Sequence, residues 1–385
     1  MTLETPPAGT GTRWRPHVTV LAFGTFAVGT DAFVVAGLLP EIADSLDVDV
    51  AAAGQLVTVF SIAYAVLAPL LATLTAGWSR RAVLLTALTL FAAGNAATAL
   101  APAYGPVLAS RVIAAGGAAL YTASASATAA TLAGERHRGR AISIVMLGIT
   151  TSLALGAPLG TAVGAALGWR TTMWLVTALA VAVVPPVALR LPHLRQDVAT
   201  GLRRRLAPLA DRRILTVLAT TVVVFTGIYI PYTYITAVYA PAVSGDGNRA
   251  AILLLVFGVA GTVGNLVAGH LTDRHGPRKV VLVATLALTA VFLALPAFRE
   301  PLAAAAPAVA VSALFSFMVT TPQQHRIIAL ASPGARSMVT SLYQSALYLA
   351  ISLSGVLGAV GLSVSGAASL TLLAAGFTLT AAALT

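Results

Sequence analysis

The sequence contains no cysteine, which excludes disulfide bonds, thiol chemistry and cysteine-type metal sites. Charge is also scarce: 9% of the 385 residues are Asp, Glu, Lys or Arg, whereas a soluble domain carries about 25%. Hydrophobic residues make up 58% of the chain, and its mean hydropathy is +0.90. The composition therefore places the chain in a lipid bilayer, and no metal site is expected.

Three further features are missing. Residues 1–16 contain no short apolar core followed by a small-residue cleavage site, so no cleaved signal peptide is predicted. No phosphate-binding loop is present, which argues against ATP as an energy source. A net charge of +11 can indicate nucleic-acid binding. Here the basic residues lie between long apolar runs instead of on one amphipathic face, so no nucleic-acid partner is expected.

Long apolar segments follow one another along the chain, each close to the ~20 residues that a helix needs to cross a bilayer. They span residues 17–40, 52–76, 82–101, 104–132, 141–167, 171–189, 214–240, 250–271, 279–297, 302–325, 337–361 and 363–384. Because lipid offers the backbone no hydrogen-bond partner, such segments must be helical. The sequence thus predicts an all-α membrane protein with twelve transmembrane helices, and its shortest breaks lie at 101–103 and 361–363.

Arginine is distributed unevenly between the loops. Most basic residues lie on the side of the membrane that holds the N-terminus, whereas the opposite side holds Arg170, Arg249 and Arg299. Four acids cluster in the first loop of that opposite side: Glu41, Asp44, Asp47 and Asp49. By the positive-inside rule, we expect a multi-pass membrane protein with both termini in the cytoplasm.

The longest polar interval, residues 191–213, is basic and contains Pro192 and Pro208. It predicts a cytoplasmic linker between an N-terminal six-helix bundle, residues 1–190, and a C-terminal one, residues 214–385. Internal repetition supports this division, because Arg80-Arg81 after the second span and the segment 269–279 after the eighth stand at matching places.

One acid, Asp31, stands inside an apolar span, where a carboxylate costs about 2.5–3.5 kcal/mol on insertion scales and is functional by default. Counted from the same membrane face, Asp31 lies about nine residues (~14 Å) deep and Arg111 about seven residues (~10 Å) deep. Opposite charges at one depth are buried together more cheaply than apart. We expect a proton-coupling pair; a static structural pair, or two separate polar pockets, are the alternatives.

Polar stripes run along two of the predicted helices. The seventh carries Tyr229, Tyr232, Thr236 and Tyr239, and the eleventh carries Ser341, Gln344, Tyr348 and Ser352. Such stripes should face protein or water, and a phenol ring suits amphipathic ligands. Tyr229, Tyr232, Gln344 and Tyr348 are therefore candidate substrate-binding residues, with weaker candidates at Phe33, Tyr64, Asn95 and Tyr121. Interhelical hydrogen bonding is the alternative for each.

A glycine ridge with four-residue spacing runs along the fifth span: Gly156, Gly160, Gly164 and Gly168. A helix surface without side chains lets another helix approach closely. The ridge indicates either tight static packing or a smooth surface on which the two halves rock during transport. The spacing alone does not separate these two interpretations.

Several motifs together resemble the major facilitator superfamily over the whole chain, specifically its twelve-helix drug:proton antiporters near the chloramphenicol-resistance and sugar-efflux exporters. The segment 269–279 matches the loop motif G-x-L-x-D-R-x-G-x-R-K. Residues 29–40 look like the helix 1 signature, and Arg111 with the glycines after it looks like the helix 4 motif. Residues 156–160, which include Pro158, look like the antiporter motif of helix 5.

The resemblance implies two six-helix bundles around a cavity that opens alternately to each side. It also implies a gating role for the loop motif: Gly269, Asp273, Arg274, Gly276 and Arg278. There Asp273 would meet the N-terminus of the helix that starts near Ser337 and latch the inner gate; a surface ion pair with Arg274 or Arg278 is the alternative. The first copy of the motif departs from the family pattern, because Ala76 stands where an acid is usual.

From these features we expect a proton-coupled exporter of small hydrophobic or amphipathic compounds, with phenicol-type antibiotics favoured. It is predicted not to be an enzyme and to need no cofactor beyond the proton gradient. Its expected partners are a small-molecule substrate, protons and the lipid bilayer, and it should function as a monomer. The alternatives are efflux of a sugar or another polar metabolite, and a non-transporting membrane receptor or scaffold.

Overall fold

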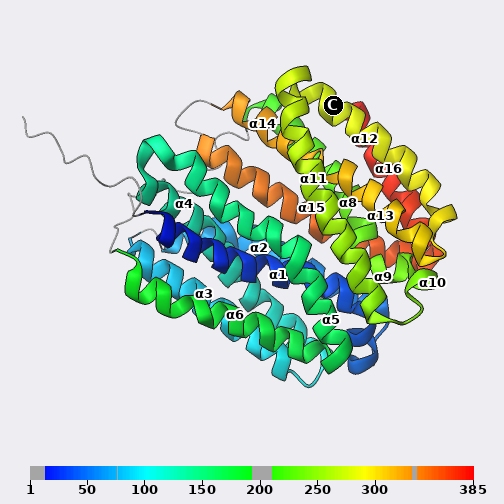
Figure 1. Cartoon of the computed structure of the whole chain (residues 1–385), viewed down its shortest axis with the longest axis horizontal. Coiled ribbons are helices and arrows are strands. Elements are labelled where there is room, and N and C mark those ends of the chain that lie inside the picture. The colour runs from blue at the N-terminus through cyan, green and yellow to red at the C-terminus, as the bar shows by residue number, and fades with distance from the viewer. Residues whose placement is uncertain (1–13, 76, 193–209, 332–335) are drawn as a thin grey trace, which may run out of the picture.

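The computed structural model describes residues 14–75, 77–192, 210–331 and 336–385, and the regular elements in this part of the chain are helices (Figure 1). The first half consists of α1 (Trp14–Leu46), α2 (Val50–Leu74), α3 (Arg80–Leu100), α4 (Tyr104–Thr151), the π-helical η1 (Ser152–Gly156), α5 (Ala157–Leu167) and α6 (Trp169–Arg190). The second half begins with α8 (Arg212–Thr233), α9 (Ile235–Val238), α10 (Ala240–Val243), α11 (Gly247–His275) and α12 (Pro277–Ala294). It ends with the 3-10 turn η3 (Leu295–Phe298), α13 (Leu302–Phe317), α14 (Thr320–Leu330), α15 (Arg336–Ser365) and α16 (Ser369–Leu384).

The predicted transmembrane helices are confirmed. Among the described residues, 11 helices are long and apolar enough to cross a membrane, and the shorter α16 is also apolar. The long α4 comprises the fourth span and the start of the fifth, joined at Gly134, whose positive φ of 65° interrupts the helical geometry. At 16 residues, α16 reaches about 24 Å, somewhat less than the ~30 Å of a hydrocarbon core.

Two predicted boundaries are wrong. The sequence predicts a break at 361–363, but α15 continues to Ser365 and the chain turns at Gly366, which supplies a φ of 76°. Gly361 instead packs against Leu370 of α16. The predicted seventh span, 214–240, is also not one helix: α8 ends at Thr233, and the short α9 and α10 follow. Pro231, near the end of α8, lacks the N–H that would continue the hydrogen-bond ladder.

The two halves pack mainly within themselves, as the colours of Figure 1 show. In the first half, α1 contacts α4 and α6, and α3 contacts α4; in the second, α8 contacts α15 and α16, and α11 contacts α13. Across the boundary, α2 packs against α15 and α5 against α11. Most of the predicted linker, residues 193–209, lies outside the described residues.

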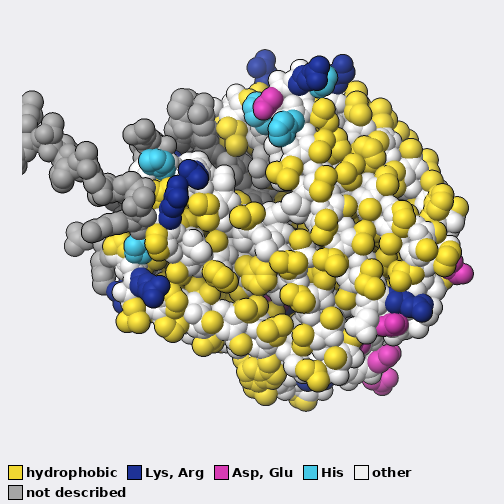
Figure 2. Space-filling view, in the orientation of Figure 1, with side chains coloured by type: hydrophobic (Ala, Val, Ile, Leu, Met, Phe, Trp, Pro, Cys, Tyr) yellow, Lys and Arg dark blue, Asp and Glu magenta, His cyan; other side chains and the backbone are white. Residues whose placement is uncertain are grey.

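The two ends of the bundle carry different charges. One end, called the basic end here, holds the residue pairs Arg80-Arg81, Arg212-Arg213 and Arg278-Lys279 at helix starts. The other, called the acidic end, holds Asp47, Asp49, Asp246 and Glu300 around its loops. On the face shown in Figure 2, most basic side chains lie at the top and left and most acidic ones at the lower right, where a basic cluster also lies, with a broad apolar surface between them. Glu41 and Asp44, expected in a loop, instead lie on the last turns of α1, which continues to Leu46.

Candidate transport site

The structure brings Asp31 and Arg111 together. Arg111 Nη1 of α4 donates to Asp31 Oδ1 of α1 over 2.7 Å, and the two side chains are 0% exposed for Asp31 and 2% exposed for Arg111. Small residues follow the arginine on α4, and Ala114 lies against Gly94 of α3, so α3 and α4 approach closely beside the pair. A buried pair of this kind has to be held by further polar contacts to be stable.

Those contacts are incomplete. Arg111 Nη1 also faces Asn95 Oδ1 of α3 at 3.4 Å, and its guanidinium carbon lies 4.5 Å from the ring centroid of Phe60 on α2. Arg111 Nε and Asp31 Oδ2, however, are buried without a hydrogen-bond partner among the described residues. The second carboxylate oxygen therefore has no partner among the described residues, so the ionised Asp31 depends mainly on Arg111 for compensation.

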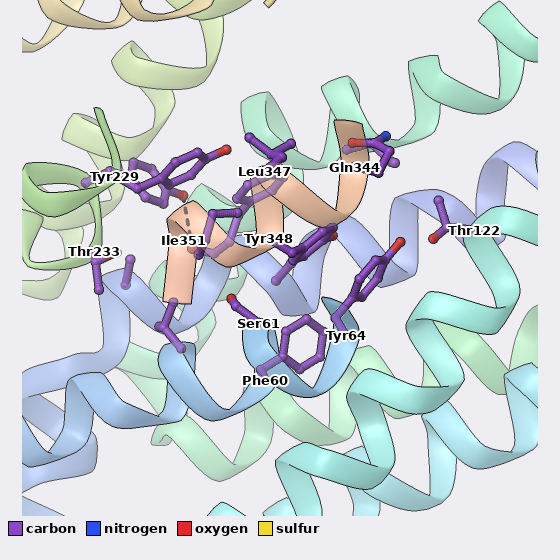
Figure 3. A pocket seen from close by; sticks show the side chains of 16 residues that line it. Phe60, Ser61, Tyr64, Thr122, Tyr229, Thr233, Gln344, Leu347, Tyr348 and Ile351 are labelled. Carbon is purple, nitrogen blue, oxygen red and sulfur yellow. Dashed lines mark hydrogen bonds between the residues drawn. The ribbon is translucent and has the colours of Figure 1, made fainter. Parts of the chain in front are cut away.

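A cavity lies beside this pair, between the two halves (Figure 3). It is lined from α1, α2 and α4 on one side and from α8 and α15 on the other, and its volume is about 80 Å³. Its aromatic lining consists of Phe33, Phe60, Tyr64, Tyr229, Tyr232 and Tyr348, and its other polar side chains are Ser61, Thr122, Thr233 and Gln344. None of the described residues that line it carries a formal charge.

Two aromatic contacts cross this cavity from one half to the other. Tyr64 of α2 stacks on Tyr348 of α15, with ring centroids 3.6 Å apart. Tyr232 of α8 meets Phe33 of α1 edge to face at 6.1 Å and donates its hydroxyl to the Phe33 carbonyl oxygen over 3.1 Å. Aromatic rings from the two halves thus contact each other on the wall of the cavity and narrow it.

Most of the substrate-binding residues predicted from the sequence lie on this cavity: Phe33, Tyr64, Tyr229, Tyr232, Gln344 and Tyr348. Tyr121 does not. It is fully buried inside the first half against Gly24, and its hydroxyl donates to the Leu21 carbonyl oxygen over 3.2 Å. The next residue, Thr122, lines the cavity instead, because one step along a helix turns a side chain by about 100°.

Sequence reasoning missed Phe60, Ser61 and Thr233. The signal for Phe60 and Thr233 was helical spacing, since Phe60 precedes Tyr64 by one turn and Thr233 follows Tyr229 by one turn. Of the remaining stripe residues, Thr236 and Tyr239 are buried elsewhere, Ser352 is buried away from the cavity lining, and Ser341 is exposed.

The glycine ridge of the fifth span packs inside its own half. Side chains of α1 occupy the space where a Cβ would stand on each glycine: Thr30 at Gly156, Val34 at Gly160 and Leu38 at Gly164. Gly168 has a φ of 85° and forms the turn between α5 and α6. The ridge therefore favours the static-packing interpretation over a sliding surface between halves.

Other residues of the same span contact the second half of the chain. Gly258 of α11 lies against the backbone of Leu153 and Ala154, and Gly247 against Ala165. Pro158, which follows the π-helical turn 152–156, cannot donate the N–H that an α-helical ladder needs there, and this explains the turn.

The loop motif surrounds the end of α11 at the basic end. Gly276 stops the helix with a φ of 81°, nothing lies close to Gly269, and Arg278 Nε donates to the Thr385 carbonyl oxygen over 2.6 Å. Asp273 and Arg274 are exposed, and within the described chain Asp273 forms no ion pair with Arg274 or Arg278. Ala76, in the first copy of the motif, lies outside the described residues, and so does the side chain of Ser337.

Between the cavity and the acidic end, Tyr234 fills the space between α2 and α15. Its ring lies between Gly54 of α2 and Gly358 of α15, with no room for a side chain on either glycine. Its hydroxyl donates to the Gly355 carbonyl oxygen over 2.8 Å. Beyond it, an open depression at the protein surface is lined by residues that include Asp49, Ala237 and Ser363.

Two helical halves around a central cavity are an arrangement typical of membrane transporters. The family model described as Major Facilitator Superfamily matches residues 21–242 and 217–385. The chain therefore belongs to the major facilitator superfamily, and it is a transporter of small molecules and not an enzyme.

Several relatives match the chain over most of its length. The chloramphenicol resistance protein of Streptomyces lividans is 33% identical over 332 residues, which cover 85% of this chain and 84% of that protein. The uncharacterized MFS-type transporter YbcL of Bacillus subtilis (strain 168) is 32% identical over 359 residues, covering 93% and 91%. Among solved structures, a D-xylose-proton symporter superposes with a TM-score of 0.77 at 16% identity over 95% of this chain and 97% of that chain, a likeness of fold alone.

Proposed function

We propose that this transporter is a proton-driven exporter of small hydrophobic or amphipathic compounds, with phenicol-type antibiotics as its favoured substrates. One observation carries the proposal: the buried Asp31–Arg111 pair, 2.7 Å apart, adjoins an uncharged aromatic cavity formed by both halves. A charge that can be neutralised thus lies next to a binding space whose shape depends on how the halves meet.

Asp31 is the proposed proton site. Its Oδ2 is buried and unpartnered among the described residues, and the next residue, Ala32, lines the cavity. A proton on Oδ2 neutralises the carboxylate and weakens its bond to Arg111, which changes the balance of buried charge between two arrangements of the halves. In an exporter that exchanges substrate for protons, this change alternates with substrate binding.

The lining chemistry supports an apolar substrate with a few hydrogen-bonding groups. Six aromatic rings and several aliphatic side chains supply apolar contact, while hydroxyls and the Gln344 amide supply directed polar contacts. The absence of a formal charge among the described lining residues disfavours a strongly charged substrate, because its desolvation would be uncompensated. The chloramphenicol resistance relative supports the phenicol class.

The cavity of about 80 Å³ is smaller than the ~300–1,000 Å³ of pockets that hold drug-sized ligands. The structure therefore corresponds to a closed arrangement, in which Tyr64–Tyr348 and Tyr232–Phe33 hold the halves together. Substrate entry must separate at least one of these contacts. Asp273, which is exposed, is the proposed inner latch.

Export of a sugar or another polar metabolite is the second candidate, favoured by the hydroxyls of Ser61, Thr122 and Thr233 and by the Gln344 amide on the same cavity. We also propose a monomer in the bacterial inner membrane, with both termini in the cytoplasm. The separation of basic and acidic ends supports this orientation.

Uptake into everted membrane vesicles tests the function. Vesicles with the protein should accumulate radiolabelled chloramphenicol when respiration acidifies their interior, and a protonophore should abolish the accumulation. Vesicles without the protein are the background control. Accumulation of D-xylose but not chloramphenicol would favour the polar alternative, and protonophore-insensitive accumulation would contradict proton coupling.

A further inference from the structure

Phe60 lies between the buried charge pair and the cavity. Its ring centroid is 4.5 Å from the guanidinium carbon of Arg111, and the same side chain lines the cavity (Figure 3). Phe60 is 2% exposed, so the guanidinium and the ring are both shielded from bulk water. Its ring also approaches that of Tyr64, at 6.4 Å, which stacks on Tyr348 of the other half.

A guanidinium over an aromatic face is attracted by the electron-rich face of the ring, and the attraction grows when both groups are desolvated. While Asp31 is ionised, it neutralises Arg111 at 2.7 Å, and the attraction to the ring is secondary. Once Asp31 carries a proton on Oδ2, Arg111 keeps its positive charge but its bond to the now neutral Oδ1 weakens, so the Phe60 face and Asn95 Oδ1 gain weight as partners. The ring is then held more strongly by Arg111.

We propose that Phe60 is a positioning residue that communicates the protonation state of Asp31 to the cavity wall. This inference rests on the proposed function, because it takes Asp31 as the proton site. The proton enters on Asp31 Oδ2, no charge leaves Arg111, and the change at the cavity is a stronger hold on one aromatic ring of its lining. That ring in turn limits how Tyr64 and Tyr348 stack across the halves.

Among the described residues, the groups that titrate or carry charge around Asp31 come from three helices. Arg111 faces it from α4, and the phenols of Tyr64 and Tyr348 come from α2 and α15 near the cavity. From α3, the neutral amide of Asn95 completes the surroundings of the arginine. A pH dependence that requires the Phe60 ring therefore reports on the Asp31–Arg111 pair.

A single-cysteine experiment tests this without a substrate, because the chain has no native cysteine. Gln344→Cys places a thiol on the cavity wall, and its maleimide labelling rate is measured from mildly acidic to mildly alkaline pH in the full-length protein. The rate is compared in four backgrounds: no further change, Asp31→Asn, Phe60→Leu and Phe33→Leu. Phe33→Leu is the matched control, since it removes another ring from the same cavity without touching Arg111.

Each labelling rate is normalised to the thiolate fraction of its own background, because Asp31→Asn changes the charge near the thiol. The pH dependence that is left is the part that depends on Asp31. We expect Asp31→Asn and Phe60→Leu to lose this part, a change of about fivefold in relative rate for a desolvated ring contact, while Phe33→Leu keeps it. Phe60→Tyr retains the aromatic face and should retain the dependence as well. It also provides the comparison should Phe60→Leu fail to fold.

Two outcomes overturn different claims. If Asp31→Asn abolishes the pH dependence but Phe60→Leu retains it to the same extent as Phe33→Leu, the role of Phe60 is wrong and the proton site stands. The role of Phe60 is also wrong if Phe60→Tyr loses the dependence in a folded protein. If Asp31→Asn leaves the pH dependence unchanged, the proton site itself is wrong, and the inference about Phe60 fails with it.

Discussion

Tyr64 and Tyr348 stack almost face to face, with ring planes 16° apart and centroids 3.6 Å apart, although they belong to different halves of the chain. The contact lies on the cavity wall, so it both narrows the cavity and joins α2 to α15. A substrate of drug size cannot occupy the cavity until these rings part. Their surfaces then become available to the substrate.

Substitutions at Tyr348 should distinguish the contribution of its aromatic ring to substrate binding from that of its hydroxyl group. An aromatic contact contributes about 0.5–1.5 kcal/mol beyond area burial, so Tyr348→Ala should weaken chloramphenicol binding about tenfold or less. Tyr348→Phe keeps the stacking surface and should bind close to the wild-type level. Equilibrium binding of radiolabelled chloramphenicol to purified protein measures both; equal affinity in the two variants and the wild type would place the binding surface elsewhere.

Asp31→Asn should fold and insert but lose gradient-driven transport. The amide oxygen that replaces the carboxylate still accepts from Arg111, so the packing survives, whereas no proton can bind at neutral pH. Chloramphenicol accumulation in proteoliposomes with an imposed pH gradient measures the effect. Asp246→Asn, in an exposed pair with Arg249 at 3.6 Å, is the control that should transport normally. Wild-type accumulation in Asp31→Asn would refute the assignment.

Arg111→Met should destabilise the protein. Removing the arginine leaves an ionised carboxylate buried without its partner, which costs about 3–5 kcal/mol. Adding Asp31→Asn to Arg111→Met removes that charge, so the double variant should recover part of the loss. Thermal unfolding in one detergent at neutral pH compares the three variants. A double variant less stable than Arg111→Met alone would show that the pair is not the source of the loss.

Gly54→Ala should open the acidic end. Any side chain there meets the Tyr234 ring, so α2 and α15 must move apart. With Ala237→Cys as a reporter in the depression beyond Tyr234, maleimide labelling should accelerate. Tyr234→Phe should have a smaller effect, since it loses one hydrogen bond to Gly355, worth about 0.5–1.5 kcal/mol. Gly376→Ala, with free space around it, is the control; equal labelling in Gly54→Ala and this control would contradict the closure.

The sequence predicted the spans and the meeting of Asp31 and Arg111 for the same physical reason. Charged residues are so unfavourable in lipid that the apolar spans can be recognised directly in the sequence. An acid and a base buried in two of these spans are buried at lowest cost when they contact each other. Counting residues from the helix ends sufficed to place both at one depth, and the 2.7 Å contact agrees with that count.

What the sequence could not predict is which neighbour each helix face meets. The spacing of Gly156, Gly160 and Gly164 defines a smooth face, but only the packed structure identifies α1 as its neighbour. Likewise, Tyr121 and Thr122 are adjacent, and a small error in helix rotation exchanges the buried residue for the one on the cavity. Pro231 pointed to a kink, but the sequence did not show that the helix is interrupted at Tyr234, or that this ring packs between Gly54 and Gly358.

The division of the seventh span into α8, α9 and α10 makes the two ends of the molecule mechanically unequal. Helices of four residues, such as α9 and α10, are too short to be stable alone, so they keep their shape only through what they pack against. By contrast, α8 and α11 are continuous helices of 22 and 29 residues. The acidic end can accordingly change shape in short segments at Tyr234 and Tyr239, without the movement of an entire helix.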